Sequence, residues 1–261
     1  MIEIRYLRAA TVLIRWDGLT LLTDPWFARR MRGLPVFVRP CLTPAELPAL
    51  DLVLVSHLHP DHFDRRALSR LAAPCKLLVG PPALAKKLTG VRHERFVALG
   101  DGQRISESDY RITAFAVEHS GYENAYLVER GESSLLFAGD ARYSPVFRRI
   151  AAQCKPLVSL LPVGGTEILG RRIVMDPADA WQAATDLGTK VTVPIHPGGE
   201  WLSVPPLSRH PGRAARLAEL ARECGSTFAV GVLAPGERGA ADLAGRWHPL
   251  DRERTELDAG K

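Results

Sequence analysis

The chain has 261 residues, of which 46% are hydrophobic and 24% are charged. This composition is typical of a globular protein, and the apolar runs are too short to cross a bilayer, so we expect no transmembrane segment. The formal net charge is +5, but the basic residues are spread along the chain, which argues against nucleic acid as a partner.

A single domain is expected for residues 1–261, because the chain can bury a large core and no Pro/Gly/Ser-rich linker divides it. The charged tail from about residue 250 lacks apolar periodicity and is expected to fray. Residues 1–6 alternate like a strand and carry no signal-peptide pattern, so we place the protein in the cytoplasm. The 4 cysteines include no CxxC pair and suggest neither disulfides nor a thiolate zinc site. The oligomeric state stays open.

Short strands open the chain. Apolar patterns predict strands at residues 3–7, 11–15 and 19–23, and Asp17-Gly18 supplies a hairpin turn between the last two. These patterns indicate an antiparallel meander. An apolar run at residues 52–55 predicts a further strand.

Helices and strands then alternate. Periodicity predicts helices at residues 65–71, 82–88, 145–152, 177–187 and 211–223. Strands are predicted at residues 111–117, 125–129, 134–137, 157–161, 191–195 and 228–232. Pro211 is expected to start the last helix, and Gly225 follows its end. Two mixed sheets packed face to face, with helices outside each, satisfy this order and place the chain in the α/β (α+β) class.

The motif His57-Leu58-His59-Pro60-Asp61-His62 follows directly on the strand at residues 52–55 and Ser56. Imidazole and carboxylate donors crowded at the end of a strand are typical of a zinc-type site. Residues two apart in an extended segment point the same way, so His57 and His59 are predicted to hold one ion. Asp61 and His62 lie beyond the bend at Pro60 and are predicted to turn toward a second ion.

Three further strands are followed by a candidate ligand, namely His119, Asp140 and His196. Singly, a strand-end His is more often structural and a Gly-Asp is often only a turn, but with the six-residue motif they form one set. A carboxylate has two oxygens and can bridge two cations. The predicted metal ligands are His57, His59 and His119 on one ion, Asp61, His62 and His196 on the other, and Asp140 between them.

Other polar residues receive supporting or structural interpretations. Asp24, at a strand end before Pro25, is expected to support a ligand or form a turn rather than to bind metal. Asp176 before Pro177 is interpreted first as a helix N-cap. His93, His210 and His248 lack the strand-end context and are expected on the surface or in loops, although the loop that carries His210 is able to border the site.

These residues resemble the metallo-β-lactamase fold superfamily, whose signature is His-x-His-x-Asp-His followed by an isolated His, an Asp and a final His. The closer resemblance is to the branch of N-acyl-phosphatidylethanolamine phospholipase D-like and L-ascorbate-6-phosphate lactonase-like hydrolases. It rests on the segments Leu22-Thr23-Asp24-Pro25-Trp26-Phe27, Gly139-Asp140-Ala141-Arg142-Tyr143-Ser144-Pro145 and Ile195-His196-Pro197-Gly198, besides the motif itself. The likeness extends to about His196.

The resemblance implies a four-layer αββα sandwich and a metal-dependent hydrolase. Two divalent cations are expected, with Zn²⁺ preferred and Mn²⁺ and Fe²⁺ accepted by the same donor set. Such a pair lowers the pKa of a shared water from about 15.7 toward 7, so a metal-bound hydroxide is the expected nucleophile. Asp61 is the candidate catalytic residue that orients this water and relays its proton. The bond cleaved is an ester, lactone, amide or phosphodiester, in a small-molecule substrate that the positive charge allows to be anionic.

Three alternatives remain at this point. A metal-dependent nuclease would suit the positive charge, but no basic stripe with interleaved aromatic residues is present. A di-iron redox enzyme of the same fold would carry a carboxylate where this chain has His59. A non-catalytic metal-binding scaffold or sensor is the third, and the full set of seven donors argues against it.

Overall fold

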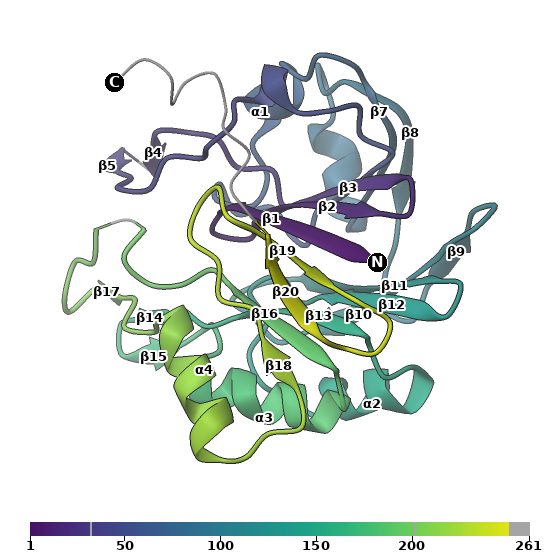
Figure 1. Ribbon diagram of the computed structural model, residues 1–261. Helices are drawn as coiled ribbons and strands as arrows, with labels where there is room; N and C mark the ends of the chain where they lie inside the picture. Colours follow the sequence, from purple (N-terminus) through teal and green to yellow (C-terminus); the bar gives the residue numbers. More distant parts are fainter. Residues whose placement is uncertain (32, 201, 251–261) are drawn as a thin grey trace.

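The computed structural model describes residues 1–31, 33–200 and 202–250. Two large sheets of eight and seven strands lie face to face (Figure 1). The tail that was expected to fray lies outside the described residues, except for Leu250, which ends a strand. No helix in the described part of the chain is both long and apolar enough to span a membrane.

The eight-stranded sheet has the order β20-β19-β1-β2-β3-β6-β7-β8. Its strands are β1 (Ile2–Arg8), β2 (Thr11–Trp16), β3 (Leu19–Thr23), β6 (Leu52–Leu54), β7 (Cys75–Gly80), β8 (His93–Ala98), β19 (Arg238–Ala241) and β20 (Trp247–Leu250). The pairs β1–β2 and β2–β3 are antiparallel, which confirms the predicted meander. From β3 onward the neighbours β6, β7 and β8 pair in parallel.

The seven-stranded sheet has the order β18-β16-β13-β12-β11-β10-β9. Its strands are β9 (Arg104–Ser106), β10 (Arg111–Val117), β11 (Glu123–Arg130), β12 (Ser133–Phe137), β13 (Val158–Pro162), β16 (Val191–Ile195) and β18 (Ala229–Val230). Two small sheets are formed by β4 (Arg30–Met31) with β5 (Leu34–Pro35), and by β15 (Arg171–Arg172), β14 (Glu167–Ile168) and β17 (Ser208–Arg209).

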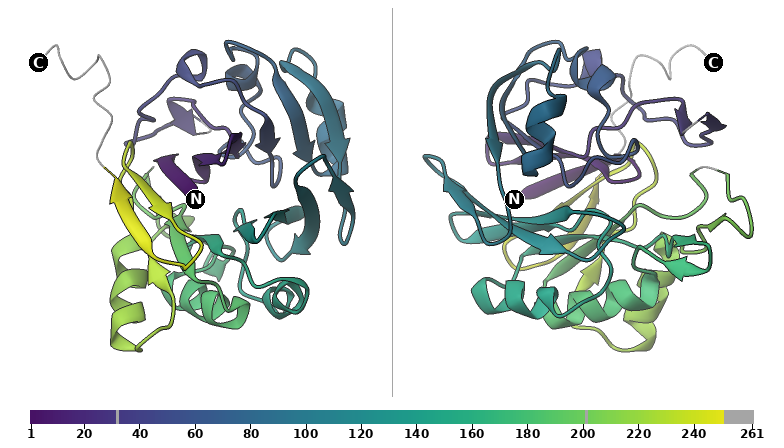
Figure 2. Two further views of the ribbon diagram at one scale, coloured as in Figure 1. Left: turned by 45° about the vertical axis from the view of Figure 1, so that its right-hand side comes forward. Right: turned by 180° about the vertical axis from the view of Figure 1, so that it is seen from behind.

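Helices cover the outer face of each large sheet, which confirms the four-layer αββα arrangement (Figures 1 and 2). The helices are α1 (Arg65–Leu68), α2 (Val146–Gln153), α3 (Pro177–Leu187) and α4 (Ala214–Glu223), with 3₁₀ helices η1 (Pro44–Glu46) and η2 (Pro82–Lys87). Side chains such as Ile4 and Val158 fill the space between the sheets. Phe147 and Leu217 pack the second sheet against α2 and α4, and Leu68 packs α1 against the first.

The topology gathers four strand ends at one edge of the sandwich. β6 belongs to the parallel part of the first sheet, and β12 and β16 belong to the parallel part of the second. β10 runs antiparallel to β11, which runs antiparallel to β12, so β10 and β12 point the same way. Within the second sheet β10, β12 and β16 therefore run in one direction, and the residues that follow β6 in the first sheet lie beside their ends. Each of the predicted ligands follows one of these four strands.

Several predicted elements differ from the structure. The helix expected from Pro211 begins at Ala214, because the preceding segment is tied to the second sheet: Gly212 donates to the carbonyl of Gly164, and a Cβ on Gly212 would collide with the Val163 carbonyl. The helix expected at residues 82–88 is a 3₁₀ helix, and the one at residues 65–71 ends at Leu68. The strand expected at residues 228–232 is reduced to β18, and the chain then returns to pair with β1.

Candidate metal centre

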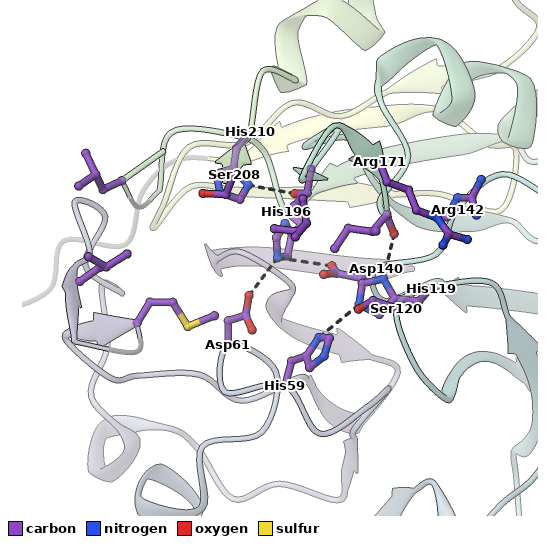
Figure 3. Close-up of a pocket in the computed structure, with 16 residues that line it drawn as sticks. His59, Asp61, His119, Ser120, Asp140, Arg142, Arg171, His196, Ser208 and His210 are labelled. Carbon is purple, nitrogen blue, oxygen red and sulfur yellow. Dashed lines mark hydrogen bonds and ion pairs between the residues drawn. The ribbon is translucent and has the colours of Figure 1, made fainter. Parts of the chain in front are cut away.

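The structure brings the seven predicted ligands together at the edge where β6, β10, β12 and β16 end. Figure 3 shows His59, Asp61, His119, Asp140 and His196 pointing toward one another from these separate segments. Potential ligand atoms of His57, His59 and His119 lie within 4.8 Å of one another, and so do those of Asp61, His62, Asp140 and His196. We call these sets the three-histidine group and the mixed group. These two sets match the division that the sequence predicts, with Asp140 in the mixed group, and a third set of Asp24, His57 and His62 overlaps both.

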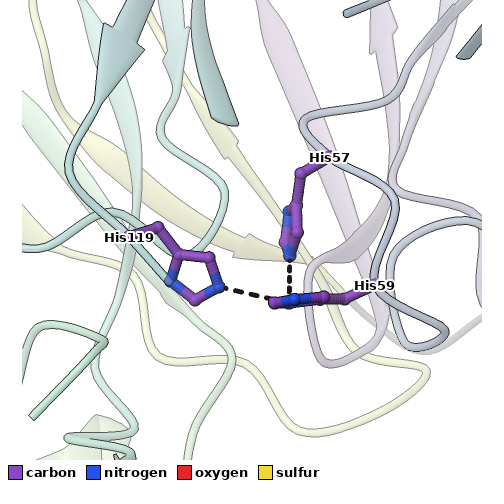
Figure 4. A group of neighbouring side chains, drawn as sticks. All are labelled: His57, His59 and His119. Carbon is purple, nitrogen blue, oxygen red and sulfur yellow. Dashed lines mark hydrogen bonds between the residues drawn. The ribbon is translucent and has the colours of Figure 1, made fainter. Parts of the chain in front are cut away.

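The three-histidine group offers three nitrogens to one point (Figure 4). Nδ1 of His59 lies 2.8 Å from Nε2 of His57 and 3.2 Å from Nε2 of His119. A single ring proton can satisfy only one of these contacts, whereas a cation can accept all three lone pairs. Burial lowers the pKa of His57 and of His59 to about 4. Both rings are therefore neutral near pH 7, which is the state that coordinates metal.

The mixed group combines two carboxylates with two imidazoles in a buried site. Nε2 of His62 lies 3.2 Å from Oδ2 of Asp140, and Nε2 of His196 lies 3.4 Å from Oδ1 of Asp140 and 3.6 Å from Oδ2 of Asp61. Oδ1 of Asp140 and Nε2 of His62 are buried and form no hydrogen bond to the described residues. This donor set fits a divalent cation, which would compensate two acid groups that are otherwise costly to bury.

The charges within the mixed group favour positive charge at its centre. Burial alone would raise the pKa of Asp140, but the imidazoles of His196 and His62 outweigh burial and hold the pKa well below its usual range. Burial alone would lower the pKa of His62, and the carboxylates of Asp140, Asp61 and Asp24 instead raise it well above its ordinary value. A proton on His62 thus neutralises the same acid groups that a cation would neutralise.

Asp24 holds His62 from behind. Its Oδ2 lies 2.6 Å from Nδ1 of His62, and both side chains are fully buried. The backbone N–H and the hydroxyl of Ser56 also donate to Asp24, at 2.7 and 2.6 Å. Asp24 therefore contacts the ring nitrogen that faces away from Asp140. This is the geometry of a carboxylate that orients a metal-binding His.

Glu123, which the sequence analysis does not single out, lies behind the three-histidine group. Oε1 of this fully buried carboxylate is 3.3 Å from Nδ1 of His57 and accepts the backbone N–H of Asp140 at 2.6 Å. Oε2 lies 3.8 Å from Nδ1 of His119. Burial raises the pKa of Glu123 to about 7. The available sequence signal is weak: an acidic residue four positions after His119, at the start of a buried strand.

His196 is also fixed by groups that the sequence does not reveal. Its φ is +50°, a left-handed conformation that is uncommon outside glycine. Its backbone N–H donates to the carbonyl of Ala9 at 2.8 Å, and the N–H of Ala9 donates to Oε1 of the buried Glu200 at 2.7 Å. Tyr6 donates its hydroxyl to the same oxygen at 2.8 Å. The first strand thus fixes the last predicted ligand.

A cavity of about 730 Å³ opens onto both groups (Figure 3). His59, Asp61, His119, Asp140 and His196 line its inner end. The small sheets supply much of its mouth, including Met31, Leu34, Ile168, Arg171 and Ser208. Arg142 follows β12 and also lines the cavity. The candidate ligands are therefore open to a small molecule.

The remaining histidines and Asp176 lie largely as expected. His210 borders the cavity, with Nδ1 3.1 Å from Oγ1 of Thr166. His93 lies in β8 and His248 in β20, outside both ligand groups. Asp176 caps α3 by accepting the N–H groups of Ala178 and Asp179, which confirms the N-cap interpretation.

Comparison with known proteins identifies relatives of both sequence and fold. A family model for a β-lactamase superfamily domain matches residues 20–197. A metal-dependent hydrolase of Methanopyrus kandleri is 29% identical over 251 residues, covering 90% of this chain and 98% of the relative.

Among solved structures, an isothiocyanate hydrolase from Delia radicum gut bacteria has a TM-score of 0.75 at 20% identity, covering 91% of this chain and 98% of its own. The di-iron β-hydroxylase CmlA of Streptomyces venezuelae has a TM-score of 0.68 at 17% identity, covering 95% of this chain and 54% of its own. These structural likenesses show a shared fold, and because that fold carries both a hydrolase and a hydroxylase, the reaction has to be argued from the site.

Proposed function

This chain belongs to the β-lactamase superfamily, and from that premise we propose that it is a binuclear metal-dependent hydrolase. His57, His59 and His119 would hold one divalent cation, Asp61, His62 and His196 the other, and Asp140 would lie between the two. The observation that supports this most strongly is the pair of adjacent buried groups, in which three imidazoles converge and in which Oδ1 of Asp140 and Nε2 of His62 form no hydrogen bond to the described residues. Zn²⁺ is the preferred ion, and Mn²⁺ or Fe²⁺ suits the same donors.

When bound, two divalent cations lower the pKa of the attacking water and polarise the bond to be cleaved. Residues of the chain orient the attacking water and the imidazole rings. Asp61 lines the cavity with Oδ2 3.6 Å from Nε2 of His196, so its carboxylate is placed to hold the attacking water and accept its proton. Asp24 contacts Nδ1 of His62, and Nδ1 of His57 contacts the Ser56 hydroxyl at 2.9 Å and Glu123 at 3.3 Å. These contacts leave Nε2 of each ring directed at the centre.

The lining of the cavity indicates an anionic small-molecule substrate. Arg142 and Arg171 both reach the cavity, and apolar contact is offered by Met31, Leu34 and Ile173. A negatively charged substituent would be bound by the guanidinium groups while the scissile ester, lactone, amide or phosphodiester bond lies at Asp61 and Asp140. The four cysteines are free, in keeping with our proposal of a cytoplasmic location.

The test is metal analysis combined with a substrate screen. Protein purified without chelator, or reconstituted with Zn²⁺, Mn²⁺ or Fe²⁺, should contain about two ions per chain and hydrolyse members of a panel of carboxylate- and phosphate-bearing esters, lactones and amides. His57→Ala and Asp140→Ala should abolish turnover and lower the metal content while the circular dichroism spectrum is kept. A metal content near zero after reconstitution would refute the proposal, and bound metal without turnover would favour a binding scaffold.

A further inference from the structure

A second cleft, of about 510 Å³, reaches the three-histidine group from another direction. His57 and His59 belong to its lining. Its walls come from Leu58, from Pro82 and Ala83 at the start of η2, and from Tyr122. The volume lies within the range of roughly 300–1,000 Å³ that is common for small-molecule sites.

The two cavities meet at the candidate metal centre. His59 lines both of them. The loop between β10 and β11 separates them, because His119 and Ser120 line the larger cavity whereas Gly121 and Tyr122 line the cleft. A molecule bound at His59 can therefore extend into the larger cavity, which Arg142 and Arg171 line, and into the cleft at the same time.

The chemistry of the cleft differs from that of the larger cavity. Leu58, Pro82 and Ala83 present hydrocarbon, and no Asp, Glu, Lys or Arg belongs to its described lining. Tyr122 is 53% exposed, although it is a large aromatic side chain. A charged substituent would find no partner in the cleft, whereas an apolar substituent would cover the Tyr122 ring and the proline face.

We propose that this cleft is the subsite for an unbranched apolar chain of the substrate, such as a medium-length acyl chain, whose reacting group lies at His59 while the anionic part occupies the arginine-lined cavity. This inference rests on the proposed hydrolase function but concerns a separate surface. Each methylene that the cleft covers fully should raise affinity by a factor of up to about four.

The chain offers a matched pair of variants. Ala83 and Ala85 are both exposed on η2, but only Ala83 lines the cleft. Ala83→Phe would place a ring in the cleft and narrow it, and Ala85→Phe adds the same ring to the same helix away from it. Because neither alanine is buried, both variants should keep the wild-type melting temperature.

Calorimetry with octanoate and acetate as probes measures the subsite directly on the Zn²⁺-reconstituted protein. We expect octanoate to bind at least about tenfold more tightly than acetate, Ala83→Phe to reduce this ratio to about twofold or less, and Ala85→Phe to keep it. Hydrolysis of 4-nitrophenyl octanoate relative to the acetate ester should follow the same pattern in kcat/KM.

Equal binding of octanoate and acetate by the wild type would overturn the subsite. A preference for octanoate that survives Ala83→Phe would overturn it as well, because the acyl chain would then occupy the larger cavity. Absence of turnover on every ester would count against the hydrolase while the binding ratio still decides the cleft. Turnover without a chain-length preference would keep the hydrolase and reject the subsite.

Discussion

Oδ2 of Asp24 and Nδ1 of His62 lie 2.6 Å apart in a fully buried contact, although 38 positions separate the two residues in the chain. Asp24 also accepts the backbone N–H and the hydroxyl of Ser56, the residue before the six-residue motif, and these bonds fix its position as well. The contact leaves Nε2 of His62 directed at Asp140, at 3.2 Å. A change at Asp24 should therefore affect metal binding through His62, although no predicted ligand is replaced.

We expect Asp24→Asn to weaken Zn²⁺ binding at the mixed group by about 10- to 100-fold, because an amide supports the orientation and basicity of His62 less well than a carboxylate. Competition with a chromophoric chelator measures this affinity. Asp176→Asn is the matched control, since it removes a carboxylate from the N-cap of α3, where Asn also caps well. Wild-type zinc affinity in correctly folded Asp24→Asn would contradict the supporting role.

Gly139 is required by the space around Glu123. Its φ is +56°, and an added Cβ would collide with Oε1 of Glu123 and lie 2.8 Å from Cβ of Ser56. Gly131 has nearly the same φ, +55°, but a Cβ there meets nothing within 4 Å. The two glycines therefore differ in crowding and share the conformational requirement.

Gly139→Ala should lower the free energy of unfolding more than Gly131→Ala does. In both variants the left-handed backbone of the new alanine should lower the free energy of unfolding by roughly 1–2 kcal/mol. Only Gly139→Ala should lose about 1–3 kcal/mol more through overpacking. Urea unfolding in the presence of chelator measures the free energies of unfolding of both variants without a contribution from metal. Equal losses would mean that Glu123 and Ser56 move aside freely and that the packing behind His57 is loose.

The sequence predicts the ligand-bearing strand ends well because each depends on local pattern. The apolar run before His57 and those before Asp140 and His196 form strands in the structure, and the handedness and parallel pairing of such units bring their ends to one edge. The αββα layers follow from the same alternation of elements.

Other features depend on contacts between distant segments and leave little trace in the sequence. β19 has the sequence Arg-Gly-Ala-Ala, a poor strand former, and it exists because it pairs with β1 at the opposite end of the chain and because Gly239 leaves room for the Trp247 ring. The positions of Glu123 and Glu200 likewise depend on neighbours more than fifteen residues away, Asp140 and Ala9.

Metal removal should destabilise the fold in proportion to the occupancy of the two groups. A ligand that binds only the folded state at 100 times its Kd adds about 2.7 kcal/mol to the free energy of unfolding. We therefore expect EDTA to lower the melting temperature by several degrees and added Zn²⁺ to restore it. In Asp140→Ala, which leaves the three-histidine group intact, both treatments should shift the melting temperature less than in the wild type. A wild-type melting temperature that is indifferent to chelator and to Zn²⁺, Mn²⁺ and Fe²⁺ would contradict cation binding.

Arg171 and Arg172 allow the proposed anion site to be tested with neighbouring residues. Both lie in β15, but Arg171 lines the large cavity, whereas Arg172 forms ion pairs with Asp176 at 2.6 Å and Asp179 at 3.3 Å.

Arg171→Gln should raise KM for a carboxylate-bearing substrate by about three- to tenfold, because the guanidinium is exposed and its contact with the anion is partly screened. For an analogue of the same substrate without the carboxylate, KM should change little, and kcat should change little for both substrates. The dependence of KM for the carboxylate-bearing substrate on salt should become shallower. Arg172→Gln should leave the KM ratio between charged and uncharged substrates at the wild-type value. A parallel rise of KM for both substrates in Arg171→Gln would show that the side chain shapes the cavity mouth without recognising charge.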